Sequence, residues 1–373
     1  MKKAKEFIPV SQPVFNGNEK KYILEALDTG WISSEGPFVE RFENNFSLKV
    51  NRKYGVAVSS GTAALDIAVK ALGIREGDEV IMPTFTIISC VSAVINSGAT
   101  PIFIDADPKN WNMQINDIEE NITDRTKAIM AVHIYGLPVD MDPILEIANK
   151  FNLYVIEDAA QMHGQYYKES PCGSFGDIST FSFYANKHIT TGEGGMLVTN
   201  NESLKNKCQL LRNLCFKEKQ RFVHDEFGWN YRFTNIQAAI GLAQLERLDE
   251  IVQKKKLIGK WYNELFLNMP GITLPLEMTD YAENIYWVYG LVLDGNVDAN
   301  IITNRLNENG IGTRPFFYPM HKQPVLKTFI DYGSQQFPIS ERLAKQGFYL
   351  PSGLGLKQND VERVAKELIQ LLN

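Results

Sequence analysis

The sequence predicts an α/β protein with a seven-stranded, mostly parallel sheet, followed by a smaller α+β domain at the carboxyl end. Between residues 54 and 200, short β-branched runs alternate with segments of helical periodicity. Most of these runs are almost continuously apolar, as strands buried on both faces of a sheet are. Alternating strands and helices indicate βαβ units and a parallel sheet covered on both sides. Near residue 241 the alternation stops, and a long helical pattern and shorter, mixed segments follow.

The expected strands of the large sheet are Tyr54–Ser59, Glu79–Phe85, Pro101–Asp105, Ala128–Tyr135, Leu153–Glu157, Ile178–Phe183 and Gly195–Thr199. Amphipathic stretches between them are expected to be helices, for example Ala63–Leu72 and Pro143–Phe151.

The pattern from Ile236 to Lys256 predicts one long helix. After it we expect a strand at Trp287–Leu293, a helix at Ala299–Asn309 and a closing helix at Val361–Leu372. We therefore expect two domains, residues 1–250 and residues 251–373.

Composition and charge are those of an ordinary globular protein, with 44% hydrophobic and 22% charged residues. The net charge of −6 argues against general binding to nucleic acid or membrane surfaces. The four cysteines form no Cys-x-x-Cys pair and have no histidine at metal-site spacing, so we expect reduced thiols, no metal site and a cytoplasmic protein. The basic amino terminus lacks the apolar stretch of a signal peptide, and no run approaches the roughly 18 apolar residues of a membrane span.

Lys187 lies in the run STFSFYANKHITTGEGGM, residues 179–196, directly after an expected strand. Small residues, aromatics and glycines are unusual surroundings for a solvated point charge. Lysine forms a Schiff base with a carbonyl when its surroundings favour the neutral amine. Taken alone, this lysine could also be an ordinary surface residue of a loop.

The segment from Val56 to Leu65 runs from a strand through Ser60, Gly61 and Thr62 into a helix. Free backbone N–H groups at a helix start, with hydroxyls beside them, make a site for an anion such as phosphate. The alternative is that the hydroxyls only cap the helix. The segment is neither a P-loop nor a Gly-x-Gly-x-x-Gly fingerprint, so it does not indicate a nucleoside triphosphate or a dinucleotide.

Asp158 ends an expected strand, and ligands of open α/β sheets bind at the carboxyl ends of strands. Because side chains alternate along a strand, only one of Glu157 and Asp158 can face that crevice. A carboxylate there could pair with a protonated ring nitrogen and keep it protonated. A helix-capping aspartate is the alternative.

Three further residues fit the same ligand. Phe85 could stack on an aromatic ring, although a phenylalanine at a strand end more often belongs to the core. Gln161, one helical turn beyond Asp158, could donate to a ring hydroxyl, and Ser182 lies near Lys187. A Schiff-base lysine, a partner for a pyridinium, a ring stacker and a phosphate cup are together the requirements of pyridoxal phosphate.

The chain resembles the fold-type I pyridoxal-phosphate enzymes, and within them the nucleotide-sugar aminotransferases of the DegT/DnrJ/EryC1/StrS family. The segments that carry the resemblance lie in family order and are GWISSEGPFV (30–39), SGTAAL (60–65), EDAAQ (157–161), FSFYANK (181–187), TGEGGM (191–196) and WNYRFTNIQAA (229–239).

The resemblance implies that Lys187 carries the cofactor pyridoxal 5′-phosphate and that Asp158 pairs with its pyridine nitrogen. Gln161 would contact the ring 3′-oxygen, and Phe85 would stack on the ring. The residues expected around the phosphate are Ser60, Gly61, Thr62 and Ser182.

Asn230 matches the family position that reaches the phosphate of the neighbouring subunit's cofactor, so the resemblance implies a homodimer with shared active sites. Sugar 3-dehydratases of the family carry histidine where aminotransferases carry the lysine. Lys187 therefore favours amino transfer over dehydration.

Residues 310–324, GIGTRPFFYPMHKQP, resemble the carboxyl-terminal region of those family members that aminate GDP-4-keto-6-deoxymannose with glutamate as amino donor. Arg314 and His321 are then candidates for substrate contacts, because a permanently charged guanidinium suits carboxylate or phosphate. His321 could instead be a satisfied loop histidine. Trp31, Ser33 and Arg232 are weaker candidates.

The sequence thus predicts a transaminase that moves an amino group from glutamate to the C4 keto group of a nucleotide-linked 4-keto-6-deoxy sugar. The alternatives are an aminotransferase for another dTDP- or UDP-linked keto-sugar, a pyridoxal-phosphate-dependent sugar 3-dehydratase, and a non-catalytic relative that uses the fold for binding.

Overall fold

The computed structural model describes residues 6–217, 219–295, 297–329 and 335–372, and within them the larger sheet has seven strands. Its spatial order is β1-β9-β8-β5-β4-β2-β3. The strands are β1 (Tyr54–Val58), β2 (Glu79–Pro83), β3 (Thr100–Ile104), β4 (Thr126–Val132), β5 (Tyr154–Asp158), β8 (Ile178–Ser182) and β9 (Gly195–Thr199). All seven expected strands are present, and the predicted α/β fold class is confirmed.

Only β9 runs against the other strands of this sheet. It pairs antiparallel with β1 and β8, whereas β8, β5, β4, β2 and β3 pair parallel in succession. The carboxyl ends of β1, β5 and β8 therefore lie at the same edge, where ligands of open α/β sheets bind.

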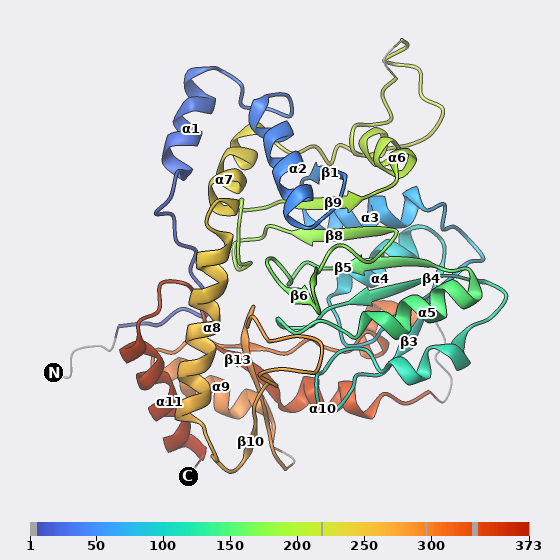
Figure 1. Cartoon of the computed structure of the whole chain (residues 1–373). Coiled ribbons are helices and arrows are strands. Elements are labelled where there is room, and N and C mark those ends of the chain that lie inside the picture. Colours follow the sequence, from blue (N-terminus) through green and yellow to red (C-terminus); the bar gives the residue numbers. More distant parts are fainter. Residues whose placement is uncertain (1–5, 218, 296, 330–334, 373) are drawn as a thin grey trace.

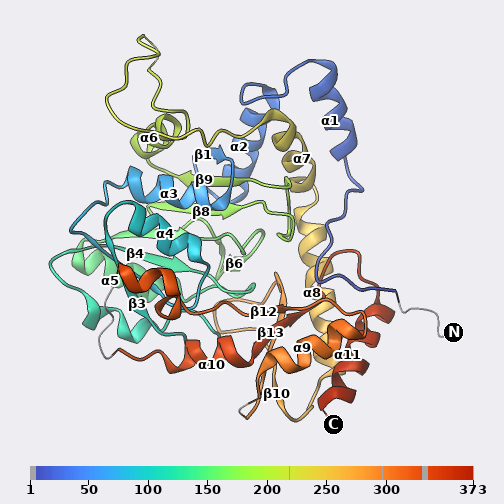
Figure 2. The same cartoon turned by 180° about the vertical axis from the view of Figure 1, so that it is seen from behind.

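Helices cover both faces of the large sheet (Figures 1 and 2). One face carries α3 (Gly61–Ala71), α4 (Ile88–Asn96) and α6 (Glu202–Arg212), and the other carries α2 (Pro37–Lys49), α5 (Met141–Phe151) and α7 (Asn235–Leu245). Alternation along β1 sends Val56 and Val58 into the core under α3 and Ala57 into the opposite core. Each strand thus contributes to two apolar layers, which explains the continuous apolar runs.

The smaller sheet has the order β10-β11-β13-β12 and is antiparallel throughout. Its strands are β10 (Ile272–Thr273), β11 (Tyr289–Leu293), β12 (Arg314–Pro315) and β13 (Gly347–Leu350). The long helix α8 (Leu248–Leu265), α9 (Ala299–Glu308) and α11 (Gln358–Leu372) share an apolar core with it, at the lower end of the molecule in Figure 1. The expected domain boundary near residue 250 falls close to the start of α8 and stays a prediction.

The helix expected from Ile236 to Lys256 is two helices, α7 and α8, separated at Glu246 and Arg247. The Glu246 carboxylate accepts hydrogen bonds from Tyr22 and Asn18, which lie on or beside α1 (Glu19–Asp28). The sequence has no glycine or proline at this break, and the apolar pattern continues through it. No local signal therefore predicts the break, and the hydrogen bonds at Glu246 come from residues far away in the sequence.

The remaining elements are α10 (Pro338–Gln346), the short hairpin of β6 (Tyr166–Tyr167) and β7 (Ser170–Pro171), and 3₁₀ turns at Ile115–Asp117, Glu119–Asn121, Met320–Lys322 and Pro324–Thr328. Among the helices in the described ranges, none combines the length and apolar character needed to cross a membrane.

Candidate active site

Lys187 projects from the turn after β8 into a cavity of about 370 Å³. The turn is fixed by hydrogen bonds from Lys187 N to Tyr184 O (2.9 Å) and from Phe183 N to Gly194 O (2.8 Å). The cavity lies at the carboxyl edge of the large sheet, where residues on or beside the smaller sheet close it, and its size suits a small cofactor. Its lining includes Ser60, Gly61, Thr62, Asp158, Gln161, Ser182 and Lys187.

Burial lowers the pKa of Lys187 to about 8, although the nearby Asp158 and Cys90 act to raise it. No salt bridge among the described residues holds the Lys187 ammonium. A substantial share of the amine is therefore neutral near physiological pH, as a nucleophile or a base requires.

Asp158 reaches the cavity from the end of β5 and is buried. Its Oδ1 accepts a hydrogen bond from Ala160 N at 3.0 Å, and its Oδ2 accepts one from Cys90 Sγ at 3.2 Å. Burial raises its pKa, with Ala160, Cys90 and Lys187 opposing. A buried carboxylate beside open space is stabilised by a cation, and a protonated pyridine nitrogen would supply one.

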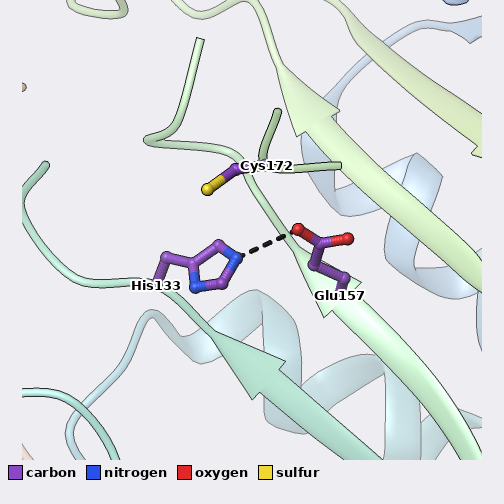
Figure 3. A group of neighbouring side chains, drawn as sticks. All are labelled: His133, Glu157 and Cys172. Carbon is purple, nitrogen blue, oxygen red and sulfur yellow. Dashed lines mark hydrogen bonds and ion pairs between the residues drawn. The ribbon is translucent and has the colours of Figure 1, made fainter. Parts of the chain in front are cut away.

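Because side chains alternate along β5, Glu157 faces away from Asp158. It lies with His133 and Cys172 in a separate group of side chains (Figure 3). It accepts hydrogen bonds from His133 Nε2 (3.1 Å), from the N–H groups of Gly173 and Phe175 and from the Ser179 hydroxyl. Alternation along the strand did not tell whether Glu157 or Asp158 faces the ligand crevice. In the structure Asp158 lines the cavity and Glu157 does not.

His133, Glu157 and Cys172 lie within 4.8 Å of one another, a spacing that could suit a metal ion. However, His133 Nδ1 accepts a hydrogen bond from Val139 N (3.2 Å), so Nε2 carries the proton that it donates to Glu157. Neither imidazole nitrogen has a free lone pair, and the carboxylate already has several donors. The group anchors β5 to the loop at 173–179.

The start of α3 forms a cradle for an anion. Ser60 caps the helix through a hydrogen bond from Ala63 N to its Oγ (3.0 Å). The N–H groups of Gly61 and Thr62 precede the first intrahelical hydrogen bonds and lie at the positive end of the helix dipole. A Cβ at Gly61 would lie 2.8 Å from Ser182 Cβ, so a side chain there would fill the cradle. The predicted cap is therefore present, and the anion site beside it stays a prediction.

Gln161 is oriented by the main chain. Its Oε1 accepts a hydrogen bond from Tyr135 N, which leaves the amide NH₂ as a donor at the cavity. An aldehyde-reactive amine, a carboxylate for a ring nitrogen, an amide donor and an anion cradle in one cavity fit pyridoxal phosphate.

Phe85 is a correction to the sequence interpretation, because it is fully buried and does not line the cavity. Its ring lies about 6 Å from the rings of Tyr135, Phe316 and Phe317, centroid to centroid. The chain leaves β2 at Pro83, and the residues of this segment that line the cavity are Ile87, just before α4, and Ser89, in its first turn.

His321 is a second correction. Its Nδ1 lies 2.8 Å from Thr84 Oγ1, its Nε2 lies 3.2 Å from Glu341 Oε1, and its ring packs on Phe337. Both nitrogens are occupied within the protein, and the residue does not line the cavity. Of the two alternatives for His321, the structure therefore contains the loop histidine whose ring nitrogens both have partners within the protein.

The remaining substrate candidates lie elsewhere. Ser33 and Arg232 line a second hollow of about 1070 Å³, which is larger than the cavity of Lys187 and also contains Arg212, Lys217 and Arg221. Lys187 and Asp158 line the smaller cavity, so the volume of a hollow does not indicate where the reactive groups lie.

Trp31, Asn230 and Arg314 are exposed and line neither hollow. Arg314 pairs across β12 and β13 with Tyr349, whose side chain does line the cavity. Arg314 is therefore at the cavity rim.

An aromatic wall on or beside the strands of the smaller sheet was not predicted from the sequence. It consists of Trp287, Phe317 and Tyr349, and Tyr184 joins it from the large domain. The indole Nε1–H of Trp287 donates to Asn186 O at 2.9 Å across 101 positions of sequence. No local pattern indicates a contact of such long range.

Comparisons with known proteins agree with this geometry. The sequence pattern of the DegT/DnrJ/EryC1/StrS aminotransferase family matches residues 14–369. The chain is 43% identical to a GDP-perosamine synthase from Escherichia coli O157:H7, over 97% of this chain and 98% of that one. It is 41% identical to a GDP-perosamine synthase from Caulobacter vibrioides, over 98% of each chain. The crystal structure of the aminotransferase TlmJ from Streptoalloteichus hindustanus superposes with a TM-score of 0.91 at 28% identity, over 97% of this chain and 98% of that one.

Proposed function

Because this chain belongs to the DegT/DnrJ/EryC1/StrS aminotransferase family and is a pyridoxal-phosphate-dependent transaminase, we propose that it aminates GDP-4-keto-6-deoxymannose. Glutamate is the proposed amino donor, and GDP-perosamine the product. The observation that carries the proposal is Lys187 in one cavity with Asp158 and the phosphate cradle. The relatives named GDP-perosamine synthase support the choice of sugar nucleotide.

Lys187 would anchor the cofactor and then move protons. Bound pyridoxal phosphate supplies an electron sink that makes the donor's Cα–H acidic. Lys187 would take this proton at Nζ and pass it to the cofactor within the same half-reaction. In the opposite half-reaction it would take a proton back from the cofactor and place it on the carbon that had been the keto carbon of the sugar. A pKa of about 8 suits this work, because both protonation states are then accessible near neutral pH.

The other cavity residues hold the cofactor in place. Asp158 would keep a proton on the ring nitrogen, and its own orientation is fixed by Ala160 and Cys90. The Gln161 amide would donate to the ring oxygen. The phosphate would lie on the N–H groups of Gly61 and Thr62 beside the Ser182 hydroxyl, where the α3 dipole favours negative charge.

We also propose a homodimer with shared active sites. The predicted substrate residues Ser33 and Arg232 line the larger hollow, which we call the basic hollow because it also contains Arg212, Lys217 and Arg221. It lies apart from Lys187, and Asn230 is exposed beside it. If the basic hollow of one protomer faces the cavity of its partner, these residues meet the cofactor phosphate and the negatively charged nucleotide. Mixing inactive Lys187→Ala and Arg232→Ala protomers should then restore activity, and persistent inactivity of the mixture would contradict the shared site.

The proposed function is tested with purified protein, glutamate and a panel of GDP-, dTDP- and UDP-linked 4-keto-6-deoxy sugars. Mass spectrometry should show an amino group in place of the keto oxygen, with the GDP-linked sugar preferred. Lys187→Ala should lose the visible absorbance of the lysine-linked cofactor together with turnover. Preference for another nucleotide, or loss of a sugar oxygen without gain of nitrogen, would overturn the assignment.

A further inference from the structure

Trp287 places its ring directly against the reactive amine. Lys187 Nζ lies 3.8 Å from the centroid of the Trp287 ring, in the geometry of a cation–π contact. The indole is almost fully buried and lines the cavity. Its N–H donates to the carbonyl of Asn186, the residue just before Lys187. The ring is therefore fixed relative to the same turn that carries the lysine.

Among the described residues, no titratable group forms a salt bridge with Lys187, whereas the Trp287 ring is in direct contact with it. Asp158 faces it from β5 and acts to raise the pKa of Lys187, but its oxygens accept hydrogen bonds from Ala160 N and from the Cys90 thiol of α4, not from Lys187. Glu193 also lines the cavity without a salt bridge to Lys187. His163 and His188 are buried behind the turn, and burial lowers both of their pKa values, that of His163 to about 3. Both imidazoles are thus neutral and supply no charge.

In the part of the chain that the structure describes, Lys187 Nζ forms no hydrogen bond and no salt bridge, so Trp287 is the partner that it contacts. A carboxylate at this place would fix the amine as an ammonium and remove the neutral form that attacks a carbonyl. An aromatic face stabilises the cation more weakly and leaves both protonation states accessible.

We propose that Trp287 is a positioning residue for Lys187, and that its ring face receives the amine as an ammonium whenever Lys187 is not bound to the cofactor. When Lys187 takes a proton from the donor's Cα, the bonding electrons remain with the cofactor and the positive charge forms at Nζ, above the ring. The hydrogen bond from the indole N–H to the Asn186 carbonyl holds the ring at a fixed position relative to the turn that carries Lys187. The inference rests on the proposed role of Lys187 and extends it to a residue of the small domain.

The test measures how pyridoxal 5′-phosphate links to cofactor-stripped protein over a series of pH values. Visible absorbance gives the rate, and borohydride trapping with peptide mass spectrometry confirms attachment at Lys187. The variants are Trp287→Leu, which removes the ring, and Trp287→Phe, which keeps a ring without the indole N–H. Trp261→Leu is the matched control, because Trp261 lies 4.5 Å from Lys254 Nζ on α8 in a second cation–π pair.

In the wild type the rate should rise with pH as the Lys187 ammonium loses its proton. Trp287→Leu keeps an apolar cover but no longer stabilises the ammonium, so the midpoint should move to lower pH by roughly half a unit or more. Trp287→Phe should lie between, and Trp261→Leu should match the wild type. A purely structural role for Trp287 would change amplitudes without moving the midpoint.

An unchanged midpoint in Trp287→Leu, or one at higher pH, overturns the proposal. If circular dichroism shows that the leucine variant does not fold, Trp287→Phe carries the test alone, and an unshifted midpoint is then decisive. No sugar nucleotide is needed, so failure of the proposed substrate would not affect this readout. Attachment of the cofactor to Lys187→Ala protein would instead identify the role of Lys187 as the part that fails.

Discussion

Gly61 begins α3 in the proposed phosphate cradle, and we expect Gly61→Ala to weaken binding of pyridoxal 5′-phosphate. The new Cβ would lie 2.8 Å from Ser182 Cβ and 3.2 Å from Ser182 Oγ, and real Cβ atoms essentially never approach other atoms closer than 3.0 Å. Ser182 has little room to retreat, because it pairs with Gly195 on β9. Gly195 in turn packs against Ser60, where an added Cβ would lie 2.3 Å from the carbonyl oxygen.

The size of the effect follows from these contacts. Forcing a methyl group into a packed site typically costs about 1–3 kcal/mol. If the first turn of α3 moves away instead, the phosphate loses a hydrogen bond to a charged group, which contributes about 1.5–3 kcal/mol. Either route corresponds to roughly 10- to 100-fold weaker binding, at about 1.4 kcal/mol for each tenfold.

The assay is absorbance titration of cofactor-stripped protein with pyridoxal 5′-phosphate and, in parallel, with pyridoxal, which lacks the phosphate. The loss should be confined to the phosphorylated ligand. Gly355→Ala is the matched control, because no atom lies within 4 Å of the position of its added Cβ. Equal weakening of both ligands, or no weakening, would refute the phosphate cradle.

Two further substitutions test the interior around the site. Cys90→Ala should lower affinity for pyridoxal 5′-phosphate by roughly threefold to tenfold, because Asp158 loses its thiol donor. Cys90→Ser should restore part of that affinity in the same titration, and a serine variant no better than alanine would argue against the hydrogen bond. Burial lowers the pKa of Lys255 to about 7 from 10.5. Between pH 7 and 10.5 the unfolded chain therefore binds more protons than the folded chain. The free energy of unfolding should rise with pH across this window, by at most about 1.4 kcal/mol per pH unit. Lys255→Met should remove this slope in chemical unfolding, whereas the exposed Lys260→Met should retain it; an unchanged slope in the Lys255 variant would contradict the burial.

Much of the cavity was predictable because its residues follow strand ends. Parallel strands bring their carboxyl ends to one edge, so the segments after β1, β5 and β8 converge although they are far apart in sequence. The choice between Glu157 and Asp158 was not predictable, because a period of two defines the alternation but not its phase. The packing of β5 decides the phase, with Glu157 bound to His133 and to the loop at 173–179.

Phe85 and His321 were misplaced for a related reason. Their residue types suit a ring stacker and a substrate contact, but side-chain direction after a strand end depends on what the neighbouring domain offers. Phe85 turns into an aromatic cluster with Phe316 and Phe317, which follow β12. His321 satisfies both ring nitrogens on Thr84 and Glu341.

The sequence by itself determined the order of strands and helices, the seven-stranded sheet and most of the cofactor cavity, because hydrophobic periodicity and strand-end chemistry are local properties. Only the tertiary structure decided what faces the reactive amine. Trp287 reaches Lys187 from 100 positions further along the chain, through a hydrogen bond to Asn186 and a ring contact with Nζ. Such contacts join elements that are far apart in sequence, and no period within either element specifies them.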